Sequence, residues 1–357
     1  MRDQWLGILD ANSLSLNCEV LVINTAIKNR YKCDLLVLDE SHRYSSDNYR
    51  KVFETIEYKY ILGLTATFER LDGKHEIMNK YCPVFDEVTL ADAIANGWVS
   101  NYIEYKVIVD VPDMEIYDNL NKQFTEYFQF FNFDWNVVSN CLGKNGFKYR
   151  AQLRDIMCPN GTPEQKKQIF RQITTYSVQF MRIVQQRKAF INNHPKKIEL
   201  ARKIIEARPN SKIITFSNNI KMAESIGGPV YSGRDSKKKG RITMEEFIAA
   251  PSGVLNTIKK ADEGIDVKNL SVAIILGIDS SKIKSIQRLG RVIRKEEDKK
   301  PEIFTILINN TVELDWYKRS HTIDNAITID EQGLYDVLNG KVPKPYKKKL
   351  RDFQFRF

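Results

Sequence analysis

Two adjacent acids stand where a short apolar run ends. Asp39 and Glu40 directly follow Leu35–Leu38, and His42 comes two residues later. Such a run is typical of a strand buried on both faces of a parallel sheet, and α/β sheets bind ligands at the carboxyl ends of their strands. Buried carboxylates need a compensating cation or hydrogen bonds. We therefore expect Asp39 and Glu40 to form a metal site, because Mg²⁺ combines one or two carboxylates with phosphates.

In such a site Asp39 would hold the Mg²⁺ ion, and Glu40 would orient or deprotonate an attacking water. The alternative is a surface turn that is acidic by chance.

A basic segment late in the chain offers the complementary charge. Arg291 and Arg294 are three residues apart, so on a helix both reach the same side. Guanidinium groups placed in this way can grip a γ-phosphate and offset the charge of a transition state. Gln287 and Arg288 precede them, and Arg288 could serve as a further such group or hold structure. The alternative is a solvated basic helix.

Two groups of apolar, β-branched runs must position these side chains. One group lies before residue 112 and the other follows residue 196, with helical stretches between the runs. Runs of this kind predict strands of parallel sheets, so we expect two α/β units of the open, wound type. The expected strands are Val20–Ile23, Leu35–Leu38, Tyr60–Leu64, Lys212–Phe216, Gly253–Asn256, Ser271–Leu276 and Glu302–Leu307.

The segment between the two units differs from both. Residues 112–195 begin with crowded aromatic side chains, and Gln165–Lys188 has the pattern of a long amphipathic helix. We expect a helical insertion. Its aromatic side chains could stack on exposed bases, although a compact helical core is the simpler interpretation. Cys141, Cys158 and His194 match no zinc-binding pattern.

Composition restricts the class of protein. The 357 residues are 42% hydrophobic and 28% charged, which suits folded domains and excludes a disordered chain. No apolar run approaches the roughly 20 residues that cross a bilayer, and the five scattered cysteines form no CxxC pair. We expect a reducing, cytosolic setting and no membrane partner. The net charge of +10 and a basic, aromatic segment after Lys341 favour a polyanion such as nucleic acid.

Three segments resemble motifs of superfamily 2 helicases, and they follow one another along the chain in the order of that family. Asp39–His42 looks like the DExH box, motif II, and Gln287–Arg294 matches the Q-R-x-G-R-x-x-R pattern of motif VI. Between them Gly63–Thr67 resembles motif III, whose hydroxyls, here those of Thr65 and Thr67, couple the ATP site to the nucleic-acid track. Hydroxyls at a strand end can bond side chains of motif II such as His42. The resemblance implies that Arg288 binds the nucleotide and that the catalytic residues are Asp39, Glu40, His42, Gln287, Arg291 and Arg294.

Further residues match motifs that contact the nucleotide sugar and the nucleic acid. Thr257, Gly264 and Asp266 fit motif V. The resemblance implies a nucleic-acid contact for Thr257 and a place beside the nucleotide for Gly264 and Asp266. Ser217 ends a segment that resembles motif IV, and Thr25 stands where the family has a backbone contact of motif Ib. Ser217 and Thr25 are therefore expected at the nucleic acid, with ordinary strand ends as the alternative.

Two short helices indicate the branch of the superfamily. Met1–Trp5 looks like the Gln-Trp helix that follows motif Ia, and Leu90–Gly97 looks like the A-I-x-x-G helix that closes the first domain. Both suit the DNA-remodelling branch that contains the XPB-type helicases and the phage UvsW helicase. The resemblance implies ATP and Mg²⁺ as cofactors. It further implies single-stranded or branched DNA as partner, with RNA not excluded, and a cytoplasmic location in a bacterial or phage setting.

The resemblance also implies an organisation into four parts. Residues 1–111 would be an incomplete first RecA-like domain with motifs II and III, and residues 112–195 the helical insertion. Residues 196–325 would be the second RecA-like domain with motifs IV, V and VI, and residues 326–357 a C-terminal helix and basic tail. ATP would be hydrolysed where the two RecA-like domains face each other.

Motif I, the phosphate-binding loop G-x-x-x-x-G-K-[ST], is absent from the sequence. The three Gly-Lys pairs begin at Gly73, Gly143 and Gly340, and none has the required hydroxyl after it or the required glycine before it. The first unit therefore lacks its leading strand and the helix that follows, so we expect exposed apolar surface and an unpaired strand edge. Three explanations are open: a separate N-terminal fragment that carries the P-loop, a reading frame that starts at an internal methionine, or a degenerate helicase.

Three functions follow from these alternatives. The first is an ATP-dependent DNA helicase or translocase, of which this chain is the major part and which is inactive without the missing loop. The second is a non-catalytic nucleic-acid-binding or scaffold protein on a helicase fold. The third and narrowest is the motor of a restriction enzyme, for which the sequence offers no P-D…[DE]-x-K nuclease array.

Overall fold

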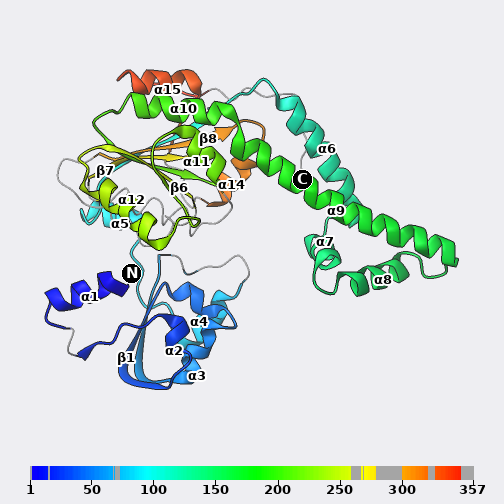
Figure 1. Ribbon diagram of the computed structural model, residues 1–357, viewed down its shortest axis with the longest axis horizontal. Helices are drawn as coiled ribbons and strands as arrows, with labels where there is room; N and C mark the ends of the chain where they lie inside the picture. The colour runs from blue at the N-terminus through cyan, green and yellow to red at the C-terminus, as the bar shows by residue number, and fades with distance from the viewer. Residues whose placement is uncertain are drawn as a thin grey trace.

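Two parallel sheets organise the chain, and a long helical arm projects beside the larger one (Figure 1). Among the residues that the structure describes, the small sheet consists of two strands and the large sheet of seven, and every strand pair in both is parallel. This confirms the predicted α/β class with two parallel sheets. The computed structural model describes residues 2–14, 17–66, 68, 73–258, 267, 269–278, 300–320 and 326–346.

The small sheet carries the acidic turn. Its strands β1 (Tyr31–Asp39) and β2 (Ile56–Leu64) are in parallel register, and Leu38, Ile56 and Met78 form part of its buried core. The apolar runs Leu35–Leu38 and Tyr60–Leu64 predict both strands, and the structure confirms them. The helices of this unit are α1 (Arg2–Ala11), α2 (Ile23–Ala26), η2 (Ser41–Ser45), η3 (Tyr49–Lys51), α3 (Val52–Thr55) and α4 (His75–Tyr81). Helix α5 (Leu90–Ala95) follows them in the chain but lies beside the large sheet in Figure 1.

One face of the small sheet is partly uncovered. Leu35, Val37 and Tyr60 share this face by strand alternation and register, and they are 51%, 44% and 69% exposed. Strands of parallel sheets are normally covered on both faces, and a sheet of only two strands is marginally stable. The sequence led us to expect exposed apolar surface on this unit, and these three side chains supply it.

The predicted strand Val20–Ile23 is wrong. Residues 18–22 have no regular structure, and α2 begins at Ile23. An apolar run becomes a strand only where a neighbouring strand offers its hydrogen bonds. Among the described residues β1 and β2 pair only with each other, so this run has no neighbour to join.

The large sheet has the strand order β5-β6-β4-β7-β8-β3-β9. Its central strands are buried almost throughout, and β4 is buried at all six positions, as continuous apolar runs predict. The strands are β3 (Ile103–Val109), β4 (Lys212–Ser217), β5 (Val230–Tyr231), β6 (Gly253–Ile258), β7 (Leu270–Ile275), β8 (Glu302–Ile308) and β9 (Ile327–Ile329). The helices of this unit are α10 (Pro195–Glu206), α11 (Ile220–Ile226), α12 (Lys237–Ala249), α14 (Val312–Ser320) and α15 (Glu331–Leu338).

Strand β3 corrects the expected boundary between the two units. It lies within residues 1–111, which the sequence assigned to the first domain, yet it pairs with β8 and β9 of the large sheet. Tyr105 of β3 lies opposite Phe304 of β8, and their rings stack with centroids 5.1 Å apart. The chain therefore passes from one sheet to the other before Ile103. The apolar pattern of β3 shows that it is a buried strand but cannot show which sheet it joins.

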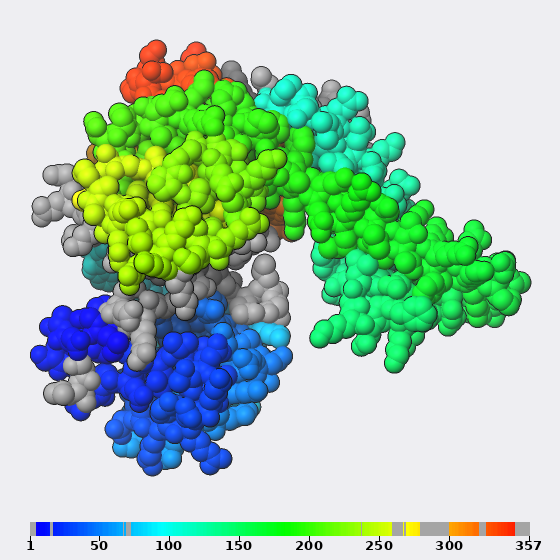
Figure 2. All heavy atoms as spheres, viewed as in Figure 1, coloured from blue at the N-terminus to red at the C-terminus, as the bar shows by residue number. Residues whose placement is uncertain are grey.

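The arm is the helical insertion. It comprises α6 (Met114–Phe130), α7 (Trp135–Leu142), α8 (Gly146–Met157) and α9 (Pro163–Asn193), and it forms a lobe of its own in Figure 2. Helix α9 contains the segment predicted to be a long helix. It starts at a capping box, in which Thr162 and the Gln165 side chain each accept from the other's backbone N–H.

Most aromatic side chains of the arm form a compact core, which was the simpler interpretation of the sequence. The rings of Phe124 and Phe128 lie with centroids 5.0 and 4.8 Å from that of Phe180, which is fully buried. Helix α9 is long but strongly polar. None of the helices in the described part of the chain has both the length and the apolar character that crossing a membrane requires.

Candidate functional site

The acidic turn closes the carboxyl end of the small sheet. Asp39 is the last residue of β1 and lies opposite Leu64, the last residue of β2. Glu40 adopts a left-handed backbone with φ of 52° and ψ of 51°, which is uncommon for such a residue and concentrates at functional sites. The turn leads straight into η2. Asp39, Glu40 and His42 are thus brought together at one end of the sheet.

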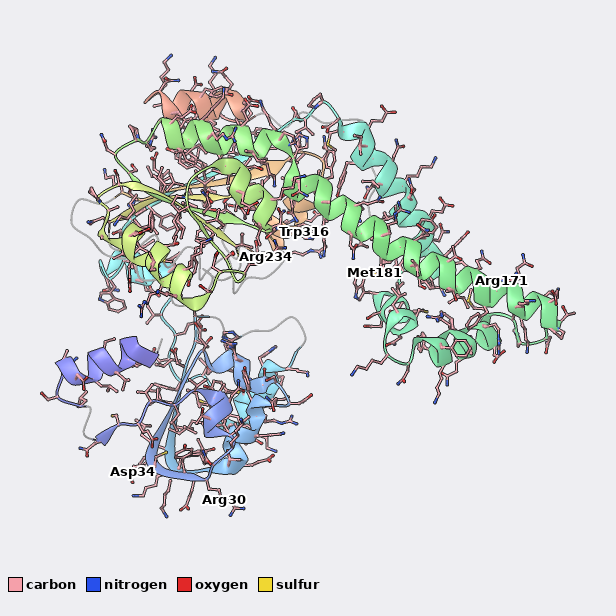
Figure 3. All side chains as sticks on the ribbon, viewed as in Figure 1. Arg30, Asp34, Arg171, Met181, Arg234 and Trp316 are labelled. Carbon is pink, nitrogen blue, oxygen red and sulfur yellow. The ribbon has the colours of Figure 1, made fainter. Side chains whose placement is uncertain are left out.

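This end of the small sheet faces the large sheet. Figure 3 labels Arg30 and Asp34, which stand just before and early in β1, at the end of the small sheet that is farther from the large one. Strand β1 therefore runs toward the large sheet, and Asp39 lies at its near end. A ligand between the two sheets would meet the acidic turn.

Both oxygens of the Asp39 carboxylate accept hydrogen bonds. The backbone N–H of Glu40 donates to Oδ1 at 3.0 Å, and the indole N–H of Trp5 donates to Oδ2 at 3.2 Å. Burial raises the pKa of the neighbouring Tyr44 phenol, and the negative charge of Asp39 raises it further. Sequence reasoning assigned neither Trp5 nor Tyr44 to the site. The Gln-Trp resemblance marked a helix there but not its contact with Asp39.

His42 links the ends of both strands. Its Nδ1 lies 3.0 Å from Oγ1 of Thr65, the residue that follows β2, and 3.4 Å from Oε2 of Glu40. The ring is buried, so these polar contacts form away from bulk water. The predicted bond between a hydroxyl at the second strand end and a side chain of the acidic box is confirmed.

A glycine allows η2 to approach β2 closely. A Cβ atom on Gly63 would lie 2.9 Å from Cys82 Sγ and 3.1 Å from Ser41 Cβ. A larger residue would push these neighbours away from the strand, so glycine at this position keeps the acidic turn seated on the sheet.

The carboxylates at this end are suitable ligands for a hard cation. Asp39 and Glu40 supply oxygen atoms of the kind that Mg²⁺ prefers. Among the described residues no group of three or more His, Cys, Asp or Glu side chains could hold a metal ion. A Mg²⁺ ion here would take its other ligands from phosphate oxygens and water, because Mg²⁺ in proteins is usually bound by one or two carboxylates together with phosphates and water.

The predicted nucleic-acid contacts differ in their exposure. Thr257 is fully buried near the end of β6, and its hydroxyl donates to the carbonyl oxygen of Thr215 at 2.6 Å. Ser217 ends β4 and is also fully buried, and its Oγ has no hydrogen-bond partner among the described residues. Thr25 lies on α2 and is exposed. Their contacts with nucleic acid stay predictions.

Several predicted site residues lie outside the described residues, so their placement is not tested. They are Thr67, Gly264, Asp266, Gln287, Arg288, Arg291 and Arg294.

Two protein families match separate parts of the chain. The family described as "Helicase conserved C-terminal domain" matches residues 196–296, and the family described as "Type III restriction enzyme, res subunit" matches residues 20–70. The first range contains strands β4, β5, β6 and β7 of the large sheet, and the second contains the whole small sheet with its acidic turn.

Curated relatives of the chain are named as translocases and helicases. The chain is 27% identical over 288 residues to "DNA 3'-5' translocase XPB2" of Sulfurisphaera tokodaii, a match that covers 79% of this chain and 60% of that protein. It is 25% identical to "Putative ATP-dependent RNA helicase L396" of Acanthamoeba polyphaga mimivirus, which covers 73% of this chain and 40% of that protein. The chain thus spans less than two thirds of the length of either relative.

A solved structure shares the fold. S. cerevisiae Dbp5 bound to RNA and ADP BeF3 is 12% identical with a TM-score of 0.52, over 89% of this chain and 65% of that one. The architecture of parallel sheets flanked by helices is that of RecA-like helicase domains. The family matches and the named relatives agree with the resemblance of this chain to superfamily 2 helicases.

Proposed function

We propose that this chain is the major part of an ATP-dependent DNA helicase or translocase that remodels branched or duplex DNA. The observation that carries this proposal is the group of Asp39, Glu40 and His42 at the end of β1 that faces the large sheet, with His42 bonded to Thr65 at the end of β2. A carboxylate pair joined to the next strand end can connect a phosphate site with a movement of the sheet.

The described residues have distinct roles in this proposal. Asp39, held by hydrogen bonds from Trp5 and from the backbone of Glu40, would ligate Mg²⁺ together with Glu40. Mg²⁺ would supply positive charge to the phosphates when bound. Glu40 would orient or deprotonate the attacking water. Through its hydrogen bond to Thr65, His42 would couple the ATP site to the segment that follows β2.

The second unit would supply positive charge from the opposite side. Arg291 and Arg294 would reach the γ-phosphate and offset the charge of the transition state, while Gln287 would be a further catalytic side chain. Gly264, Asp266 and Arg288 would contact the nucleotide. Closure of the two units on ATP and their opening after hydrolysis would move a nucleic-acid strand held by Thr25, Ser217 and Thr257.

We propose that the phosphate-binding loop comes from polypeptide outside these 357 residues. The uncovered face formed by Leu35, Val37 and Tyr60 supports this, because a strand and helix added to β1 or β2 would bury apolar surface. The greater length of the relatives also supports it. A separate fragment and an upstream segment of the same chain would cover this face in the same way.

DNA is the proposed track. The net charge of +10 suits a nucleic-acid backbone, and the relative that aligns over 79% of the chain is named as a DNA translocase. Binding through phosphate contacts should weaken steeply as salt concentration rises.

The test is ATP hydrolysis by the chain alone, with and without single-stranded and forked DNA. We expect no hydrolysis by the chain alone, and DNA-stimulated hydrolysis once a segment with the P-loop is supplied in cis or in trans. Arg291→Ala in the restored enzyme should abolish hydrolysis and leave DNA binding largely intact. Hydrolysis by the chain alone would disprove the absence of a phosphate site, and unchanged hydrolysis in Arg291→Ala would disprove the role of that arginine.

A second candidate is a non-catalytic nucleic-acid-binding or scaffold protein on the same fold. The missing P-loop and the donation of the Trp5 indole to Asp39 favour it. It predicts a DNA affinity that changes neither when ATP is added nor when Asp39 is replaced by alanine. Inactivity in every combination of the test above, with DNA still bound, would select this candidate.

A further inference from the structure

We propose that the outer half of the helical arm is a second nucleic-acid contact, which holds an unpaired strand with one base stacked on Phe147. We call this region the basic arm surface and define it as Lys144, Phe147 and Lys148 around α8 with Lys167 and Arg171 at the start of α9. The inference rests on the proposed nucleic-acid track and extends it, because the residues assigned to ATP and nucleic acid belong to the two sheet units.

Charge is unevenly distributed along the arm. Residues 112–142 contain five acids and one lysine, whereas residues 143–171 contain seven lysines and arginines and two acids. The two segments thus carry net charges of −4 and +5. A polyanion is attracted to the second segment and repelled by the first, so the charge pattern selects one part of the arm.

The cations of the basic arm surface are available for a partner. Lys144, Lys148, Lys167 and Arg171 are exposed, and none forms an ion pair with another described residue. By contrast, Arg154 and Lys166 nearby are both paired with Asp155. Figure 3 labels Arg171 on α9 toward the outer end of the arm.

Phe147 is an aromatic side chain that the arm core leaves out. It is 69% exposed, and its ring meets that of Phe170 edge to face with centroids 5.3 Å apart. The Arg150 guanidinium in turn lies 5.7 Å from the centroid of the Phe170 ring. The Phe147 ring is thus supported by neighbours while much of its surface faces solvent. Single-strand-binding proteins use such rings as platforms for bases beside cations that bind the backbone.

The arm is joined to the end of the strand that carries Ser217. At the inner end of α9 the Asn192 Oδ1 accepts from Asn218 Nδ2 at 2.9 Å, and the Asn193 Oδ1 accepts from Asn219 Nδ2 at 2.9 Å. Asn218 directly follows β4. Helix α9 has 31 residues, so it extends for roughly 46 Å from this junction. A strand bound at the large sheet and on the basic arm surface would therefore be held at two fixed places.

A partner protein is the alternative occupant of this part of the arm. Ile156 on α8 is 75% exposed and would serve an apolar protein contact at least as well as Phe147 does. Ile156 has no π-face, however, and cannot stack on a base. Phe147→Ala and Ile156→Ala therefore form a matched pair on one helix that separates base stacking from general apolar contact.

The test is equilibrium binding of the full chain to a labelled thymidine oligonucleotide of about 20 nucleotides and to a duplex of the same length. Phe147→Ala should weaken single-strand binding by at least about fivefold and duplex binding far less, because only unpaired bases stack. Lys144→Gln with Lys148→Gln should weaken both and lower the salt slope for the single strand by about 1.4. Ile156→Ala and Lys122→Gln, on α8 and on the acidic segment, should bind as the parent does.

Four outcomes would overturn the proposal. Unchanged binding in all arm variants, with a parent that binds DNA, would refute the basic arm surface and leave the proposed function standing. Equal losses in Phe147→Ala and Ile156→Ala, or equal losses on single strand and duplex in Phe147→Ala, would refute base stacking. A parent chain that binds neither oligonucleotide would refute the proposed function as well.

Discussion

Strands β1 and β4 both contain an apolar run, but their surroundings differ. Both are aliphatic parallel strands that end in a polar residue, Asp39 in β1 and Ser217 in β4. Every position of β4 is buried between β6 and β7, whereas within the described part of the chain β1 pairs with β2 alone and exposes Leu35 and Val37. Burial of a strand is therefore decided by its neighbours in the sheet and by what covers them, even when the local sequence is equally apolar.

The same contrast holds for ion pairs. In the large-sheet unit Lys197 and Glu313 are fully buried with 2.5 Å between Nζ and Oε1, and the lysine also donates to the Leu276 carbonyl at 2.9 Å. In the small sheet the Lys32–Glu57 pair has a similar length, 2.7 Å, but lies in solvent. Two ion pairs of similar length thus lie in very different surroundings, one in the low-dielectric interior and the other in water.

The largest expected effect comes from breaking the buried pair. Lys197→Met leaves the Glu313 carboxylate buried without its cation. The free energy of unfolding of the large-sheet unit should therefore fall by about 3–5 kcal/mol. Chemical denaturation with hydrogen exchange at β4 and β7 would measure this. Lys197→Met combined with Glu313→Leu should recover much of the loss, because neither charge is then left alone. A single variant as stable as the parent would show that the pair is not essential to this core.

The next effect compares aliphatic truncations in the two sheets. Ile274 is fully buried in β7, so Ile274→Ala should destabilise its unit by about 2–5 kcal/mol. Leu35→Ala on the uncovered face should cost less than about 1 kcal/mol. Denaturant titration of both variants tests the comparison. Equal losses would mean that the face of β1 is covered in the chain alone.

A smaller effect concerns the uncovered face itself. Leu35→Thr with Tyr60→Thr should lower the binding of a hydrophobic dye and the tendency to self-associate, since both side chains present apolar surface to solvent. Light scattering and dye fluorescence would detect the change. Ile327→Thr on the edge strand β9 is the control, because Ile327 is exposed while Ile329 of the same strand is buried. A control variant that changes both readings as much would contradict a special role for the small sheet.

The smallest expected effect comes from the exposed pairs of the small sheet. Lys32→Gln with Lys59→Gln removes the cations that face Glu57 and Asp34. Water and salt screen such pairs, so the melting midpoint should not change measurably near physiological ionic strength. Differential scanning calorimetry is sufficient to check this. A clear fall in the midpoint would show that these charges hold the two strands together.

Local sequence predicted much of the candidate site. The apolar run before Asp39 predicted β1, and the hydroxyl after the next run predicted the bond between Thr65 and His42. These predictions succeeded because each depends on residues that adjoin a strand end. The contact of Trp5 with Asp39 could not be predicted in this way, because it depends on how α1 folds back onto the sheet.

The sequence by itself determined the parallel α/β class, the acidic turn after β1, the long helix α9 and the uneven charge of the arm. Composition, periodicity and spacing carry this information, since each is a property of neighbouring residues. The tertiary structure alone decided that β3 joins the large sheet, that Val20–Ile23 forms no strand and that Phe147 stays outside the arm core. These outcomes depend on which distant segment supplies hydrogen bonds or covers a face, and an apolar run reads the same whether or not that neighbour is present.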